Sequence, residues 1–163
     1  MIELENFSII NFEKSNNEHL DVYNDFVSGE SKSNMISLIG ERLQLSHKTE
    51  MLEFGNAYLI TQKDNIIGYL YLTNKSKNYI YMELSILKKY RKNNIGSIFL
   101  NEITDYIFYN NNDLKEIRLN IDKSNIGSMK AAMNAGYYYD EEDYMNQKID
   151  FTRDNPYYLN KKR

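Results

Sequence analysis

The first third of the chain has apolar positions at helical spacing, and the pattern then changes to that of strands. Residues 7–11 form a short apolar run that predicts a strand, and residues 18–27 predict a helix that ends at Gly29. Residues 33–51 also predict a helix, although Gly40 weakens the pattern. Three runs rich in Tyr, Ile and Leu, separated by polar turns, then predict an antiparallel meander over residues 57–61, 66–73 and 79–87.

The helical spacing of apolar residues returns after Gly96 and continues to the asparagine-rich residues 110–113, which end the helix. Residues 116–121 alternate between apolar and polar side chains and therefore predict a strand. A second helix is expected over residues 124–135, and Gly136 stands where a C-terminal cap is common. The last predicted elements are two closing strands, at residues 137–139 and 144–152.

This order of elements predicts a single α/β domain over residues 1–163, of the mixed type in which helices cover a largely antiparallel sheet. The strand–helix–strand unit over residues 79–121 implies one parallel pair of strands within that sheet. Gly68 lies inside a predicted strand, where a glycine marks either a bulge or the close approach of another backbone.

Composition and charge exclude several classes of protein. The net charge is -3 and the pI about 5.5, whereas a general nucleic-acid binder is usually basic. No apolar run approaches the roughly 20 residues of a membrane helix, and the first residues lack the basic start of a secretory signal. The absence of cysteine excludes disulfides and cysteine nucleophiles, and His19 and His47 are too far apart in sequence to suggest a metal site. We therefore expect a cytoplasmic protein that binds no metal, no membrane and no nucleic acid.

The polar segment KKYRKNNIGS, residues 88–97, has the features of a helix start that binds an anion. A strand that enters a helix through a short turn presents the free amides of the first helical turn, and the helix dipole adds to their attraction for anions. Positive charge, room for close approach and a hydroxyl donor are supplied by Arg91, Lys92, Gly96 and Ser97. The alternative is that Asn93 or Asn94 only caps the helix, which is a common use of asparagine.

The same segment resembles the pyrophosphate loop of the GNAT superfamily of N-acetyltransferases. That signature has Arg or Gln, two variable residues, Gly, one variable residue, and then Gly or Ala. It maps onto Arg91, Lys92, Asn93, Asn94, Ile95 and Gly96. The departure is Asn94, where the family usually has glycine. If this position has a positive φ, asparagine is the best substitute for glycine.

A second segment, NIGSMKAAMNAGY, is similar to another part of the same family. The family's asparagine, the small residue three positions later, and the final glycine and aromatic residue are matched by Asn125, Ser128, Gly136 and Tyr137. The resemblance covers roughly residues 55–150, and before that only the order of elements agrees. It implies a GNAT-like fold, with helices on both faces of the sheet and a V-shaped splay between strands 4 and 5 of the family.

The resemblance implies that an acetyl group is transferred from acetyl-CoA to an amine, in a ternary complex without a covalent enzyme intermediate. Pantetheine would bind like an added strand to the open edge of the fourth strand, at Leu84, Ile86 and Leu87. The pyrophosphate would lie at residues 91–97. Asn125 either caps its helix or contacts the cofactor, and Ser128 is a further candidate contact.

A base is required because only a neutral amine attacks, and a lysine-like amine has a pKa near 10.4. Glu83 is the only carboxylate in the third strand of the meander, and its apolar neighbours predict desolvation and a raised pKa. The alternatives are that Glu83 faces solvent or pairs with Lys88 or Arg118.

The tyrosine acid that many family members use to protonate the leaving thiolate is missing, because Ala132 stands in its place. Ser128, Tyr137 and Tyr139 are the candidate substitutes, and packing is the alternative role for each tyrosine. A thiol with a pKa of about 8.5 leaves well near neutral pH, so an acid contributes less here than it does for an alkoxide.

The sequence leaves the acceptor open, since a small amine, a polyamine, an antibiotic or a peptide N-terminus all fit the resemblance. The acidic segment DEEDY, residues 140–144, either favours a cationic amine or is a solvated turn. A catalytically silent acyl-CoA sensor or interaction module is the alternative function, which Ala132 supports. A nucleotide-binding protein of another fold would need a phosphate-binding glycine motif that the chain lacks. A homodimer is compatible with the resemblance.

Overall fold

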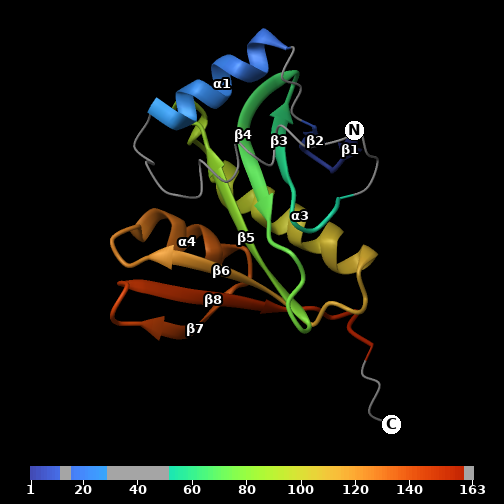
Figure 1. Cartoon of the computed structure of the whole chain (residues 1–163), viewed down its shortest axis with the longest axis vertical. Coiled ribbons are helices and arrows are strands. Elements are labelled where there is room, and N and C mark those ends of the chain that lie inside the picture. The colour runs from blue at the N-terminus through green and yellow to red at the C-terminus, as the bar shows by residue number, and fades with distance from the viewer. Residues whose placement is uncertain (12–15, 29–51, 160–163) are drawn as a thin grey trace.

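The computed structural model describes residues 1–11, 16–28 and 52–159, and its strands form one sheet (Figure 1). Within these residues the sheet has eight strands, in the order β1-β2-β3-β4-β5-β6-β8-β7. The strands are β1 (Ile2–Glu3), β2 (Ser8–Ile10), β3 (Ala57–Gln62), β4 (Asn65–Leu72), β5 (Tyr79–Ile86), β6 (Glu116–Asp122), β7 (Tyr138–Asp143) and β8 (Lys148–Asp154). The helices are α1 (Asn17–Ser28), α3 (Ile95–Asn110) and α4 (Ile126–Asn134). The helix predicted over residues 33–51 and the predicted stop at Gly29 lie outside the described residues.

The predicted meander is confirmed, because β4 pairs antiparallel with both β3 and β5. Lys63 and Asp64 connect β3 to β4, and their φ values of 49° and 64° are those of a tight hairpin turn with two left-handed residues. The short first strand is also present as β2, which pairs with β3 at the N-terminal side of the sheet.

Gly68 marks both features that a glycine in a strand can mark. The β3–β4 register shifts between Ile60 and Thr61, which leaves Ile67 as the extra residue of a bulge in β4. A Cβ atom at Gly68 would overlap the carbonyl oxygen of Ser85 in β5, so only glycine permits this approach of the two backbones. Gly68 is the register partner of Ile86, the last residue of β5, so this close approach lies beside the end of that strand.

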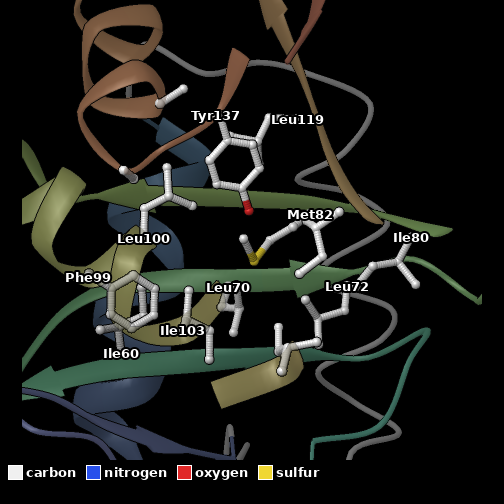
Figure 2. Close-up of a cluster of buried hydrophobic side chains, with 14 of the residues drawn as sticks. Ile60, Leu70, Leu72, Ile80, Met82, Phe99, Leu100, Ile103, Leu119 and Tyr137 are labelled. Atoms are coloured by element: carbon white, nitrogen blue, oxygen red, sulfur yellow. The ribbon is translucent and has the colours of Figure 1, made fainter. Parts of the chain in front are cut away.

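Helices cover both faces of the sheet, as the resemblance implies. Residues of α3 and α4 join the main core on one face. Phe99 and Ile103 of α3 (Figure 2) and Ala132 of α4 are completely buried there. Leu20 of α1 packs on the other face against a smaller cluster that includes Tyr69. The mixed α/β fold with helices on both faces is therefore confirmed.

The closing hairpin differs from the prediction, which placed its two strands at residues 137–139 and 144–152. β7 runs through the acidic residues to Asp143, and the turn occupies Tyr144 to Gln147. Asp143 accepts hydrogen bonds from the amides of Met145 and Asn146, and Gln147 has a φ of 55°. A carboxylate that binds the turn amides thus fixes the chain reversal four residues later than the hydrophobic pattern suggests.

The V-shaped splay is present between β5 and β6, which correspond to strands 4 and 5 of the family order. These two strands pair in parallel only where Tyr79 to Tyr81 lie opposite Glu116 to Arg118. Figure 1 shows them close together at this end and separating toward their C-terminal ends. Among the described residues, the rest of β5 pairs only with β4, so its other edge is open.

Candidate functional site

The open edge of β5 presents backbone groups toward the splay. Hydrogen bonds alternate between the two sides of an antiparallel strand. Leu87 donates its amide to the carbonyl of Ile67 in β4 at 2.7 Å, so the amides and carbonyls of Leu84 and Ile86 point the other way, toward β6. Leu84 therefore has both backbone groups at the open edge, whereas Ile86 offers only its amide, because its carbonyl accepts a hydrogen bond from Nε of Arg91. Pantetheine binding at these residues stays a prediction. Leu87 is the exception, because its amide is already bound to β4.

Arg91 fastens the loop that follows β5. Its Nε donates a hydrogen bond of 2.7 Å to the carbonyl of Ile86, so one edge of the guanidinium is used inside the protein. Its neighbour Lys92 is exposed at the surface beside the start of α3. The two basic residues therefore differ, since Arg91 holds the loop in place and Lys92 adds an exposed positive charge.

The loop reaches α3 through two asparagines with left-handed backbones. Asn93 has a φ of 53° and Asn94 a φ of 59°, so the predicted positive φ at the family's glycine position is confirmed. The Asn94 side chain makes no capping hydrogen bond, which excludes the simple capping role for this residue. Its conformation turns the chain so that Ile95 begins the helix.

The first turn of α3 has amides that remain available to a ligand. Within the described part of the chain, the amides of Gly96 and Ser97 have no hydrogen-bond acceptor, and the helical ladder begins with Ile98, which donates to the Asn94 carbonyl. A Cβ atom at Gly96 would meet no atom within 4 Å, so the space in front of this turn is open. Such a helix start fits a phosphate group. The Ser97 hydroxyl donates to the Asn94 carbonyl at 3.0 Å.

Asn125 is the N-terminal cap of α4. Its Oδ1 accepts a hydrogen bond of 3.1 Å from the amide of Ser128, so the capping interpretation is confirmed. Asn125 is exposed and Ser128 half-buried, which leaves the asparagine amide and the serine hydroxyl near the surface of the helix start.

The two tyrosines that were candidate proton donors have different environments. The Tyr137 hydroxyl lies inside the core, 2.7 Å from Oγ1 of Thr104, and burial raises the pKa of this phenol well above its usual value (Figure 2). Packing is therefore the role that the structure supports for Tyr137. Tyr139 is 54% exposed and packs edge-on against Phe151. Ala132, at the family's tyrosine position, is fully buried, and its methyl group cannot donate a proton.

Glu83 is largely removed from solvent on the face of the sheet opposite α3. Burial raises the pKa of its carboxyl, while a hydrogen bond from Tyr69 and the charge of Lys148 oppose that rise. Oε1 accepts from the Tyr69 hydroxyl at 3.3 Å, and buried Oε2 has no partner among the described residues. Arg118 pairs instead with Glu116, at 2.7 Å. The predicted desolvation of Glu83 is thus present. Two of the alternatives, an exposed carboxylate and a pair with Arg118, are not seen among the described residues.

Further polar residues share this face, and the sequence pattern did not identify them. Asp150 of β8 accepts hydrogen bonds of 2.7 Å from the Tyr81 hydroxyl and from the Asn120 amide. Burial first, and then Asp150, raise the pKa of Tyr81 to about 12. These contacts join residues of β5, β6 and β8, which are far apart in sequence. They can be recognised only once the order of the strands in the sheet is known. The alternation of polar residues within each strand is the sequence signal that places them on one face.

The acidic segment 140–144 is largely engaged within the fold. Asp140 accepts from Thr152, Glu142 pairs with Lys123 at 2.7 Å, and Asp143 binds the turn. These contacts support a structural role for most of its charge. Among the described residues there is no cluster of His, Asp and Glu that could hold a metal, and no helix is long and apolar enough to cross a membrane.

The comparisons with known proteins agree with this geometry. The acetyltransferase (GNAT) family profile matches residues 21–137. No curated protein matches the sequence. Among solved structures, Campylobacter jejuni N-acetyltransferase PseH with acetyl coenzyme A has a TM-score of 0.65 at 16% identity and covers 91% of this chain and 98% of its own. Vibrio cholerae spermidine N-acetyltransferase with CoA and spermine has a TM-score of 0.65 at 14% identity, over 95% and 99% of the two chains.

The ribosomal-protein-S5-alanine acetyltransferase of Vibrio fischeri is also similar in structure, with a TM-score of 0.63 at 16% identity over 94% of this chain and 96% of its own. These likenesses show the fold, and the family profile, which matches well over half of the chain, shows the family. The non-catalytic alternative receives no support from them. The protein is an N-acetyltransferase and belongs to the acetyltransferase (GNAT) family.

Proposed function

We propose that the acceptor of this acetyltransferase is a primary amine and that Glu83 is the base that takes its proton. The observation that carries the proposal is the desolvated carboxyl of Glu83 beside the open edge of β5, whose Oε2 has no hydrogen-bond partner among the described residues. A base works best when its pKa lies near the operating pH, and burial moves the pKa of Glu83 in that direction. The hydrogen bond from Tyr69 and the charge of Lys148 oppose this rise in the pKa.

The residues around the splay fit acetyl-CoA. We propose that the backbone of Leu84 at the open edge binds the pantetheine arm like an added strand. The amides of Gly96 and Ser97, which have no acceptor within the described part of the chain, would hold the pyrophosphate, with Lys92 adding positive charge. The neighbouring loop residues Arg91, Asn93, Asn94 and Ile95 shape this helix start, and Asn125 and Ser128 at the start of α4 are further candidate contacts.

Bound acetyl-CoA supplies the acetyl thioester. Glu83 removes a proton from the ammonium form of the acceptor, directly or through one water, and the neutral amine then attacks the thioester carbonyl carbon. The new C–N bond forms, the C–S bond breaks, and the thiolate leaves with the electron pair. The nitrogen is positively charged after the attack, and its second proton passes to the thiolate through water or through the Ser128 hydroxyl, since Tyr137 is inside the core and Ala132 has no hydroxyl.

The identity of the amine is a finer proposal. The structurally similar enzymes are described as acting on different acceptors, spermidine in one case and an alanine of a ribosomal protein in another. The common chemical feature of the proposed acceptor is an amine that is protonated in solution. The negative charge of Glu83 and Asp150 on one face of the sheet supports a cationic acceptor.

An amine screen tests the proposal. Polyamines, aminoglycosides and short peptides are incubated with acetyl-CoA, and released CoA is measured with a thiol reagent. Glu83→Gln should reduce kcat at pH 7 by 100-fold or more, because general base catalysis contributes roughly 10²–10⁴. Glu141→Gln, which removes an exposed carboxylate from β7, is the matched control. Full turnover by Glu83→Gln would show that Glu83 is not the base.

We also propose that the protein acts as a homodimer. The closing hairpin exposes Tyr138, Tyr144 and Met145 by 45%, 70% and 94%, which is apolar surface that a second copy could cover. Light scattering combined with size-exclusion chromatography tests this, and a monomeric mass at micromolar concentration would contradict it.

A further inference from the structure

Tyr69 reaches Glu83 across two neighbouring strands. Glu83 in β5 is the register partner of Tyr71 in β4, and Tyr69 lies two residues away from Tyr71 on the same face of β4. Diagonal neighbours of antiparallel strands are within reach of an aromatic side chain. The Tyr69 hydroxyl donates a hydrogen bond to Oε1 of Glu83 at 3.3 Å. Tyr69 is itself only 2% exposed, so its ring is held by the surrounding cluster.

The two carboxylate oxygens of Glu83 consequently have different roles. Oε1 accepts from Tyr69, whereas Oε2 is buried and has no hydrogen-bond partner among the described residues. A buried acceptor without a partner is costly, so such an atom points to a partner that is present during function, such as a water or a substrate proton. The bond to Oε1 also restricts rotation of the carboxylate, whose terminal torsion is otherwise broad, and thereby fixes the direction of Oε2.

We propose that Tyr69 is a positioning residue that holds Oε1 of Glu83 so that Oε2 faces the proton of the acceptor amine or of an intervening water. This inference rests on the proposed role of Glu83 as the base. It adds a residue from β4 to a site that the sequence places in β5, in the loop after it and at the start of α4. Tyr71 serves as the control residue for Tyr69, because it is a buried tyrosine in the same cluster and on the same face of the sheet.

Tyr69 orients the base and does not replace it. Burial first, and then the charge of Glu83, raise the pKa of Tyr69 far above the ordinary value of 10, so the phenol stays protonated and donates. On the Glu83 side, burial raises the pKa of the carboxyl, while the Tyr69 hydrogen bond and Lys148 of β8 lower it. Without the Tyr69 hydroxyl, only Lys148 would oppose the effect of burial.

The test compares Tyr69→Phe with Tyr71→Phe. The Glu83 carboxyl is titrated by ¹³C NMR, with Glu83→Gln identifying its signal, and the pH profile of kcat is measured in parallel. Tyr69→Phe should raise the pKa of Glu83 by about one unit and move the acidic limb of the kcat profile to higher pH by the same amount. Tyr71→Phe should change neither.

An unchanged Glu83 titration in Tyr69→Phe, or an equal shift in both variants, would overturn the inference alone. Turnover that survives Glu83→Gln would overturn the proposed base, and the positioning role with it. The two failures are therefore distinguishable, because the titration reports on the Tyr69–Glu83 contact whether or not the enzyme is active.

Discussion

The hydroxyl of Tyr137 lies 2.7 Å from Oγ1 of Thr104, inside the core between α3 and the sheet. A buried pair of this kind contributes about 1 kcal/mol to the free energy of unfolding. We therefore expect Tyr137→Phe to lower stability by about that amount and to leave kcat unchanged at its optimal pH. Urea unfolding and steady-state kinetics measure the two effects. A tenfold loss of kcat in a folded Tyr137→Phe variant would restore Tyr137 as a proton donor.

Ala132 explains why the missing tyrosine cannot simply be put back. The residue is completely buried and belongs to the same core as Tyr137. Ala132→Tyr would force a large side chain into a filled space, and we expect a loss of about 1–3 kcal/mol or more in the free energy of unfolding. Ala132→Ser is the control of nearly equal volume. A Tyr variant that is as stable as the wild type and turns over faster would contradict this prediction.

Asn94 can be tested through its backbone conformation. At a φ of 59°, replacing asparagine with alanine should cost about 1–2 kcal/mol, while glycine should be tolerated. Because the same backbone presents the start of α3, Asn94→Ala should also weaken acetyl-CoA binding, and Asn94→Gly should not. Thermal unfolding and calorimetric titration give both quantities. Equal behaviour of the two variants would show that the left-handed conformation is unimportant for the site.

The residues that could be predicted from sequence are those whose role depends on a local feature. The left-handed turn at Asn94 follows from its position in the loop before the helix. The desolvation of Glu83 follows from the apolar neighbours in its own strand. The Tyr69–Glu83 contact could not be predicted, because it depends on the register between strands. The boundaries of β7 were missed for a related reason, since acidic residues are uncommon in strands and Asp140 is held there by Thr152 of β8.

The raised pKa of Glu83 also predicts how stability depends on pH. Below the ordinary value of 4.5, the folded and unfolded chains are both protonated at Glu83, and no energy difference arises. As the pH rises from 4.5 to the raised pKa, the unfolded chain ionises at Glu83 before the folded chain does. The free energy of unfolding therefore falls over this range. Glu83→Gln removes this effect. The free energy of unfolding of the variant relative to wild type should therefore increase with pH above about 4.5.

Urea unfolding at several values between pH 4 and pH 8 measures this difference, and Glu141→Gln controls for the loss of one negative charge. A difference between Glu83→Gln and wild type that stays constant over this range would show that the carboxyl is not desolvated in solution. The comparison is made without substrate, so it is independent of whether Glu83 is the base.

Gly96 provides the most direct test of the cofactor loop. A side chain at this position projects into open space, so substitutions should leave the fold intact and act on the ligand alone. Gly96→Glu should abolish detectable acetyl-CoA binding, because it adds bulk and a negative charge where the phosphates are expected. Gly96→Lys, of similar bulk and opposite charge, should retain part of the affinity, and Gly96→Ala most of it. Calorimetric titration ranks the three variants. Normal binding by Gly96→Glu would show that the pyrophosphate lies elsewhere, whereas equal losses in the Glu and Lys variants would assign the effect to bulk alone.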